Sequence, residues 1–173
     1  MIAMQLSEAA EVVGGELVGR DGNFLGVSTD TRSITAHQLF FALRGPRFNA
    51  HDKLHEASVA GAAGAVVDQG DSGVSLSLIR TANSRRSLGS LARYWRRRFQ
   101  LPVLAVTGSS GKTTVKEMLA SIVRVRGITL ATQGNLNNDI GVPLTLFKLN
   151  REHEFAVVEM GASQPGDIAW LSE

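Results

Sequence analysis

The sequence predicts an α/β fold, with a small mixed α/β N-terminal domain followed by the first part of a doubly wound domain built on a parallel sheet. Two observations favour this fold. Short apolar runs bounded by turn residues alternate with helical segments along the chain. The composition also shifts near Gln100 and Leu101, where an arginine-rich segment gives way to the apolar run LPVLAV. We therefore expect one domain over residues 1–100 and a second, incomplete one over residues 101–173.

The N-terminal domain is expected to start with a helix in LSEAAEVVGG, with Ser7 as its N-cap and Gly14 at its end. The segments GVSTDTR, QLFFAL and LSLIR indicate short strands, and residues 50–68 indicate a helix that runs into a further strand. Asn83 is placed to cap a helix over residues 84–99. The apolar residues of that helix recur at helical spacing and predict a core stripe: Leu88, Leu91, Ala92, Trp95 and Phe99.

The second domain shows the strand–helix alternation of a doubly wound sheet. The runs LPVLAVTG, ITLA and FAVVEMG indicate three strands, and the first is typical of a strand buried on both faces. Helices are expected over residues 112–126 and 141–149, and again from Gln164 onward. One face of the first of these helices carries apolar residues that we expect to lie in the core: Val115, Met118, Leu119 and Ile122.

The composition excludes several classes of protein. Of the 173 residues, 43% are hydrophobic and 20% are charged, which is typical of a globular protein. A formal net charge of +2 is too small to indicate a nucleic-acid partner, and the absence of cysteine excludes disulfides and thiolate metal sites. The stretch MIAMQLSEAA lacks a basic region followed by a long apolar run, so we expect no signal peptide, and no apolar stretch reaches about 18 residues. We expect a cytoplasmic monomer without a membrane partner.

The segment VTGSSGKTT indicates a phosphate-binding loop between a strand and a helix. Gly108 and Gly111 permit backbone angles that let N–H groups converge on phosphate oxygens at the positive end of a helix. Lys112 supplies a cation for the terminal phosphates, and Thr113 supplies a hydroxyl for Mg²⁺. The alternative is a glycine–serine loop that only caps the helix, but its position between a buried strand and an amphipathic helix favours phosphate binding.

Glu159 ends the apolar run FAVVE, where the chain leaves the predicted sheet. Ligands of open parallel sheets bind beyond the carboxyl ends of the strands, which is also where the phosphate loop begins. A carboxylate at this edge can hold Mg²⁺, which prefers oxygen ligands. Alone, Glu159 would be interpreted as a solvated acid, but beside a phosphate loop it is predicted to bind the metal.

Three stretches, TGSSGKTTVKEM, GNLNNDIGVPLTL and VVEMGASQPGDIAW, closely resemble the Mur ligases of bacterial cell-wall synthesis. The N-terminal stretches STDTR and LFFALRGPRFNAHD resemble the nucleotide-sugar domain of that family, so the resemblance covers essentially the whole chain. The general phosphate-loop pattern has a glycine at the position of Ala105. The family's own pattern, T-G-x-x-G-K-[ST], does not require it.

The resemblance implies an ATP-dependent ligase of peptidoglycan precursor synthesis. Its motifs favour the family member that joins D-alanyl-D-alanine to UDP-N-acetylmuramoyl-tripeptide through an acyl phosphate. Lys112 and Glu159 are implied as catalytic residues, and Thr113 and Glu159 as Mg²⁺ ligands. Asn135, Asn137 and Asn138 are implied to lie near substrate, although asparagines here could also cap the next helix. The residues implied to bind the ATP phosphates are Gly108, Ser109, Ser110, Gly111, Lys112, Thr113 and Thr114.

The N-terminal motifs are implied to form the uridine-diphosphate site. Arg32 and Arg47 would pair with the diphosphate, because guanidinium groups suit phosphate oxygens. Phe48 would stack on uracil, and Asn49 or Asp52 would bind its edge. Ser28 and Asp30, from the stretch STDTR, are the remaining residues implied to belong to this site. The ordinary alternatives are turn acids for Asp30 and Asp52 and a core position for Phe48.

Three other functions share part of this sequence pattern. A phosphate-loop kinase or GTPase would carry a metal-binding aspartate after a later strand and a nucleoside-selecting motif, and neither is found in the sequence. A nucleic-acid-binding module is suggested by the arginines of RRSLGSLARYWRRRF, but these lie mostly off the apolar stripe and suit a solvated face. Folylpolyglutamate synthetase shares the phosphate-loop chemistry but lacks a uridine-binding N-terminal domain.

The family's enzymes have three domains, whereas the second domain of this chain has only three predicted strands. Later elements of the family, including a C-terminal domain that closes over the nucleotide, have no counterpart in this sequence. We therefore expect that the 173-residue chain by itself does not catalyse ligation.

Overall fold

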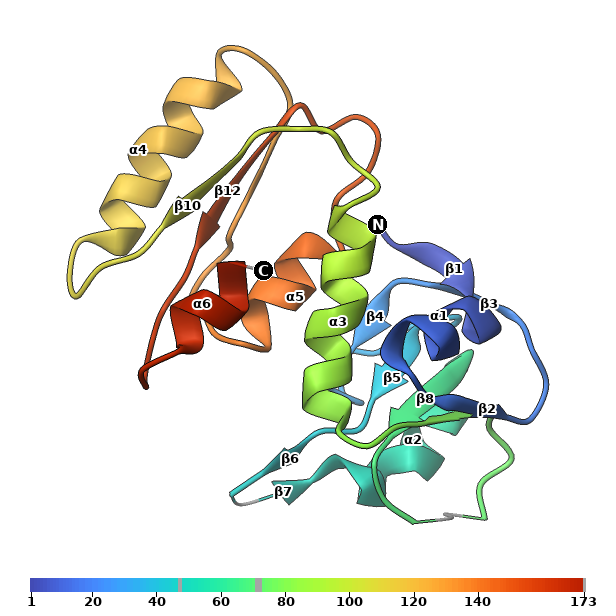
Figure 1. Ribbon diagram of the computed structural model, residues 1–173. Helices are drawn as coiled ribbons and strands as arrows, with labels where there is room; N and C mark the ends of the chain where they lie inside the picture. Colours follow the sequence, from blue (N-terminus) through green and yellow to red (C-terminus); the bar gives the residue numbers. More distant parts are fainter. Residues whose placement is uncertain (47, 71–72, 173) are drawn as a thin grey trace. The chain divides into compact units, whose positions relative to one another are not determined.

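A computed structural model describes residues 1–46, 48–70 and 73–172 (Figure 1). The chain forms two compact units, Met1–Leu91 and Ala92–Glu173. The division falls inside helix α3 (Ser84–Arg96), earlier than the composition shift at Gln100. Within the described ranges, no helix is long and apolar enough to cross a membrane.

The first unit is built on a five-stranded mixed sheet with the strand order β2-β9-β8-β5-β4. Its four parallel strands are β4 (Val27–Ser28), β5 (Leu39–Phe41), β8 (Gly64–Val67) and β9 (Leu78–Arg80). The edge strand β2 (Glu16–Val18) pairs antiparallel with β9. A separate antiparallel pair joins β1 (Ala3–Gln5) to β3 (Asn23–Leu25), and a small hairpin joins β6 (Arg44–Gly45) to β7 (Phe48–Asn49).

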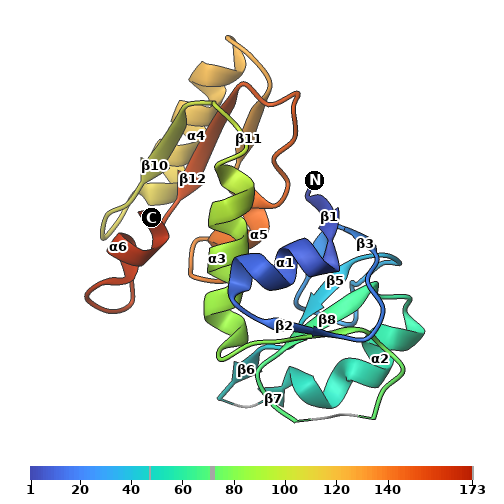
Figure 2. The same cartoon turned by 45° about the vertical axis from the view of Figure 1, so that its right-hand side comes forward.

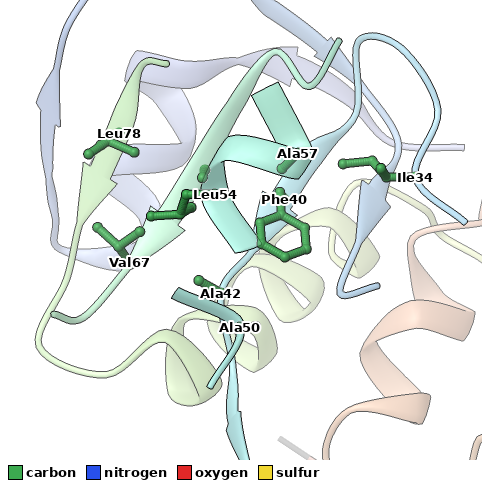
Figure 3. Close-up of a cluster of buried hydrophobic side chains, with 9 residues drawn as sticks. Ile34, Phe40, Ala42, Ala50, Leu54, Ala57, Val67 and Leu78 are labelled. Atoms are coloured by element: carbon green, nitrogen blue, oxygen red, sulfur yellow. The ribbon is translucent and has the colours of Figure 1, made fainter. Parts of the chain in front are cut away.

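A buried apolar cluster between the sheet and its helical cover holds the first unit together. The cover consists of the 3₁₀ helix η1 (Ala50–Lys53) and helix α2 (Leu54–Val59). Figure 3 shows side chains from these helices pointing toward side chains of the strands. The buried members of the cluster are Ile34, Phe40, Ala42, Ala50, Leu54, Ala57, Ala65, Val67 and Leu78. The helix-into-strand pattern predicted for residues 50–68 is therefore present, divided by a turn.

Of the three helix-end residues predicted for the first unit, two are confirmed and one is wrong. Helix α1 (Leu6–Val13) stops at Gly14, which has a left-handed φ of 63°, as expected for a C-terminal glycine. The expectation that Ser7 caps α1 is wrong, because the helix already begins at Leu6 and the Ser7 hydroxyl donates to Asp21 Oδ2 at 2.6 Å. Asn83 caps α3 as predicted: its Oδ1 accepts from the Arg86 N–H at 2.9 Å.

The second unit contains a three-stranded parallel sheet with the order β10-β12-β11 (Figure 2). The strands are β10 (Val103–Val106), β11 (Thr129–Ala131) and β12 (Phe155–Glu159). Helix α4 (Lys112–Arg124) joins β10 to β11, and α5 (Gly141–Leu146) lies between β11 and β12. Because right-handed crossovers in opposite directions place helices on opposite faces, this is the start of a doubly wound sheet, as predicted. A short helix, α6 (Asp167–Ser172), follows.

Two details of the second unit differ from the sequence-based expectation. Strand β10 is an edge strand in which only Val106 is buried, so it is not covered on both faces. The expected core face of α4 is also largely wrong, because Val115, Met118 and Ile122 are 47%, 60% and 63% exposed. The face that packs on the sheet instead carries Lys116, Leu119, Ala120 and Val123. In this rotation of α4, Thr113 and Lys116 both bond to the sheet edge.

The start of α5 gives a test of the packing in the second unit. Gly141 is buried, and a Cβ placed there would lie 2.4 Å from the backbone of Leu136. Gly141→Ala is therefore expected to lower the free energy of unfolding by about 2 kcal/mol, the usual size of an overpacking effect. Denaturant unfolding would measure this change. As a control, Gly22→Ala adds a Cβ with no atom within 4 Å and should change stability by about 0.5 kcal/mol or less; equal effects would contradict the prediction.

Candidate nucleotide-binding site

The phosphate loop connects the end of β10 to the start of α4. Gly108 and Gly111 both have positive φ angles, 153° and 73°, which residues other than glycine rarely adopt. The loop residues are exposed, so their N–H groups are accessible at the N-terminus of α4. The Lys112 ammonium lies over the loop and donates to the Gly108 carbonyl oxygen at 2.7 Å. This geometry gives an open cradle with a mobile cation at its rim.

Glu159 lies at the carboxyl end of β12, directly opposite Val106 at the end of β10. Its side chain is bonded from both sides: Thr113 Oγ1 donates to Oε2 at 2.9 Å, and Asn137 Nδ2 donates to Oε1 at 2.8 Å. Its backbone N–H donates to Thr132 Oγ1 at 2.9 Å. The predicted proximity of the phosphate loop and the acid is therefore present in the fold, where α4 meets the ends of adjacent strands.

The environment of Glu159 suits a divalent cation. The residue is 2% exposed, and within the described ranges its side chain bonds only to the neutral groups of Thr113 and Asn137. A buried carboxylate without a cation carries a large desolvation cost. The Thr113 hydroxyl and the Glu159 carboxylate are oxygen donors of the kind that Mg²⁺ prefers. The described residues contain no cluster of three or more His, Asp or Glu side chains that could hold a metal. Any Mg²⁺ here would complete its shell with water and phosphate.

The three asparagines of the loop before α5 have different surroundings. Asn137 contacts Glu159, as described, and its backbone oxygen accepts from the Gly161 N–H at 2.7 Å. Asn138 bonds the backbone where α5 starts, because its Oδ1 accepts from the N–H of Ile140 at 3.2 Å and of Gly141 at 2.8 Å. Asn135 contributes its backbone oxygen to Asn137. Asn138 therefore bonds the backbone at the start of the helix, which is close to the capping alternative, whereas the side chain of Asn137 bonds Glu159.

Two residues of this site were not singled out in the sequence. Lys116 is 1% exposed, and its ammonium donates to the backbone oxygen of Thr132 at 2.9 Å and to Glu117. Thr132 is 2% exposed and follows β11 directly. The spacing of three residues between Thr113 and Lys116 places both on one helix face, and this signal could have identified Lys116. The contact of Thr132 with Glu159 depends on strand pairing and has no local signal.

The candidate uridine-diphosphate residues lie in the first unit, in two separate groups. Ser28 ends β4, and the following turn holds Asp30 and Arg32, which form an ion pair at 2.6 Å. Phe48 and Asn49 form β7, with Asp52 in η1 just after it. No described hydrogen bond joins the two groups. Arg47 lies outside the described residues.

The second group is more consistent with contact to a ligand than with a core. Phe48 is 61% exposed, which excludes the core position that was its structural alternative. Its ring lies against Gly45, where a Cβ would come within 2.5 Å of the ring. The side chain of Asn49 accepts from the His51 N–H at 3.2 Å and caps η1. Asp52 is exposed.

A parallel sheet with a glycine-rich loop after its first strand, and an acid at the end of the neighbouring strand, has the architecture of a phosphate-loop nucleotide-binding unit. Residues 106–173 match the Mur ligase middle domain. The chain is 46% identical over 170 residues to UDP-N-acetylmuramoyl-tripeptide--D-alanyl-D-alanine ligase of Escherichia coli (strain K12), a match that covers 98% of this chain and 37% of the relative. The chain is therefore similar over nearly its whole length to part of a Mur ligase.

Solved structures of MurF ligases are similar to this chain as well. A crystal structure of MurF from Acinetobacter baumannii superposes with a TM-score of 0.93 at 36% identity and covers 99% of this chain and 38% of that one. MurF ligase from Thermotoga maritima in complex with ADP gives a TM-score of 0.77 at 34% identity, covering 84% and 34% of the two chains. The chain therefore spans less than two fifths of the length of these relatives.

The turn after β4 gives a prediction on pH. Hydrogen bonds from the Arg32 side chain and backbone lower the pKa of Asp30 from 3.8 to about 2. Because the folded pKa is depressed, the stability from this pair is fully present above pH 3.8 and is lost as the pH falls through about 2. Arg32→Gln should raise the pKa of Asp30 toward its ordinary value, as measured by NMR titration of the carboxyl carbon.

The control is Lys53→Gln. It removes the partner of Glu56, whose pKa is lowered chiefly by its hydrogen bond from Lys53. This change should move the titration of Glu56 and leave that of Asp30 in place. An Asp30 midpoint that stays the same in Arg32→Gln would contradict the prediction.

Proposed function

We propose that this chain forms the uridine-nucleotide-binding and phosphate-binding parts of a ligase that adds D-alanyl-D-alanine to UDP-N-acetylmuramoyl-tripeptide. The single observation that carries the proposal is the hydrogen bond of 2.9 Å between Thr113, in the first turn after the phosphate loop, and the buried Glu159. This hydrogen bond holds a hydroxyl and a carboxylate, two possible oxygen ligands of Mg²⁺, together at the carboxyl edge of the sheet. The name of the Escherichia coli relative supplies the substrates. Use of ATP and Mg²⁺, in the cytoplasm, is part of the same proposal.

In this proposal, the N–H groups of the loop from Gly108 to Thr114 hold the ATP phosphates at the start of α4. Lys112 exchanges its bond to Gly108 for the terminal phosphates and offsets their charge. Thr113 and Glu159 would hold Mg²⁺, whose charge stabilises the phosphoryl group during transfer. Asn137 keeps Glu159 oriented through Oε1, which leaves Oε2 directed at Thr113.

The chemistry explains why a ligase needs this phosphate site. A carboxylate is a poor electrophile because no oxygen of it leaves easily. In the proposed reaction, an oxygen of the tripeptide carboxylate attacks the γ-phosphorus of ATP, and the bond to ADP breaks. The amine of D-alanyl-D-alanine then attacks the acyl carbon of this acyl phosphate, and phosphate leaves with the electron pair of the broken C–O bond while the nitrogen loses a proton. Positioning and charge neutralisation are the main contributions of the protein.

The first unit would hold the nucleotide end of the substrate. Phe48 presents an exposed ring that can stack on uracil, as aromatic side chains do with bases. Arg32 is 87% exposed and can turn from Asp30 to a diphosphate at little cost, because exposed ion pairs contribute little stability. Ser28, Asn49 and Asp52 lie on the same two segments. Phe48→Ala is therefore the substitution of choice for weakening UDP-sugar binding.

Lys112→Ala tests the phosphate site directly. Because a cation at the terminal phosphates is lost, the affinity for Mg-ATP should fall by about tenfold or more, the cost of one charged hydrogen bond. Calorimetric titration of the 173-residue chain would measure it. Lys53→Ala removes an exposed lysine of the first unit, which bonds Glu56, and should leave the affinity unchanged. Equal affinities in wild type and Lys112→Ala, or a preference for GTP over ATP, would rule out the proposed site.

A phosphate-release assay tests the expectation that the chain alone does not complete the reaction. The 173-residue chain, given ATP, Mg²⁺, UDP-N-acetylmuramoyl-tripeptide and D-alanyl-D-alanine, should release no phosphate above the no-substrate control. Binding of ATP in the same samples would show that the phosphate site is formed. Substrate-dependent turnover would show that the residues described here are sufficient for catalysis and that the expectation is wrong.

A further inference from the structure

Lys116 is a buried cation that the proposed chemistry does not use. It is 1% exposed, although an ammonium group transferred from water into a protein interior costs several kcal/mol unless it is well bonded. A methionine or leucine could fill the same space between α4 and the sheet without this cost. The ammonium donates to the backbone oxygen of Thr132 at 2.9 Å and to the carboxylate of Glu117 at the surface. A specific role at Thr132 would explain why a charge is buried here.

Thr132 lies between Lys116 and Glu159. Its backbone N–H donates to the Val157 carbonyl oxygen at 3.0 Å, which continues the β11–β12 ladder past the end of β11. Its carbonyl oxygen accepts from Lys116, and its hydroxyl oxygen accepts from the Glu159 N–H at 2.9 Å. Three hydrogen bonds therefore hold Thr132, and two of them connect the ammonium of Lys116 to the backbone of Glu159.

The same residue begins the loop that bonds the other side of Glu159. This loop runs from Thr132 to Asn137, whose amide donates to Glu159 Oε1. We propose that Lys116 is a positioning residue, which holds Thr132 and the loop after it so that Glu159 presents Oε2 beside Thr113 for a divalent cation. The inference deepens the proposed function and rests on it, because it assigns to Lys116 the geometry of the metal ligand.

The sign of the effect separates positioning from charge. Lys116 and Mg²⁺ are both cations, so a lysine that acted only through its charge would repel the metal, and its removal would strengthen Mg²⁺ binding. Loss of positioning has the opposite effect, because residues that orient a metal ligand typically contribute about tenfold or more to metal affinity. A merely structural lysine would change stability and leave the Mg²⁺ requirement unchanged.

The experiment titrates Mg²⁺ into the 173-residue chain with a fluorescent ADP analogue and measures the Mg²⁺ concentration needed for half-maximal binding. Lys116→Met, which keeps an unbranched side chain, should raise this concentration by about tenfold. Nucleotide binding without Mg²⁺ should remain at the wild-type level. Lys116→Arg can still donate to the Thr132 oxygen and should lie closer to wild type. Lys53→Met, which changes the exposed lysine of the first unit that bonds Glu56, is the control and should behave as wild type.

Thr132→Val tests the same connection without touching the buried charge. It removes the hydroxyl at nearly constant volume and should raise the Mg²⁺ requirement in the same direction. Its effect combined with Lys116→Met should be less than the product of the single effects, because both act on Glu159. Hydrogen exchange at the Glu159 amide, measured by NMR without metal or nucleotide, should be faster in both variants.

The outcomes are distinguishable. A folded Lys116→Met variant with a wild-type or lower Mg²⁺ requirement overturns the inference and leaves the proposed function intact. If Lys116→Met does not fold, Thr132→Val decides, and an unchanged Mg²⁺ requirement in that variant overturns the inference. If the wild-type chain binds no magnesium nucleotide, the proposed function fails and this inference fails with it.

Discussion

The second unit depends on one buried carboxylate. Glu159 is 2% exposed, and it is bonded from α4 by Thr113, from the loop after β11 by Asn137, and through its backbone by Thr132. A buried acid tolerates few arrangements of its neighbours, because each unsatisfied oxygen carries a desolvation cost. The helix, the strand end and the asparagine loop are therefore held in one relative position, and that position presents the phosphate loop and the acid at the same edge of the sheet.

This constraint also explains the exposed apolar side chains of α4. An amphipathic helix on a sheet normally turns its most apolar face inward. Here the inward face includes Lys116, since Thr113 and Lys116 reach the sheet edge together, and Met118 and Ile122 lie on the outside. The rotation of the helix therefore satisfies the bonds of the site together with the packing of Leu119, Ala120 and Val123 on the sheet.

The two candidate sites differ in how firmly their residues are held. Around the phosphate loop, Lys116, Thr132 and Glu159 are each at most 2% exposed and bonded to backbone or side-chain partners. In the first unit, Arg32 and Phe48 are exposed, and the ion pair of Arg32 with Asp30 is open to solvent. A metal site needs fixed ligands, whereas a nucleotide can be bound by side chains that become ordered only on contact. The difference in burial suits the two functions proposed for them.

The sequence by itself determined the features that local chemistry controls. Apolar runs and caps at Gly14 and Asn83 indicated most strands and helices, and the glycines with Lys112 indicated the phosphate loop. The motifs also indicated a resemblance to Mur ligases, and the comparisons confirmed that similarity. The sequence pattern misplaced the cap of α1. The hydroxyl of Ser7 donates a hydrogen bond to Asp21, 14 residues further along the chain, and does not cap the helix.

Only the tertiary structure decided which residues surround Glu159. The pairing of β11 with β12 brings the Thr132 hydroxyl to the N–H of Glu159. The fold of the loop directs Asn137, and not Asn138, to the Glu159 carboxylate. Similarly, the burial of Lys116 follows from the rotation of α4 and not from its apolar pattern. The physical reason is that these contacts join segments far apart in the chain, whose register depends on packing that no local pattern encodes.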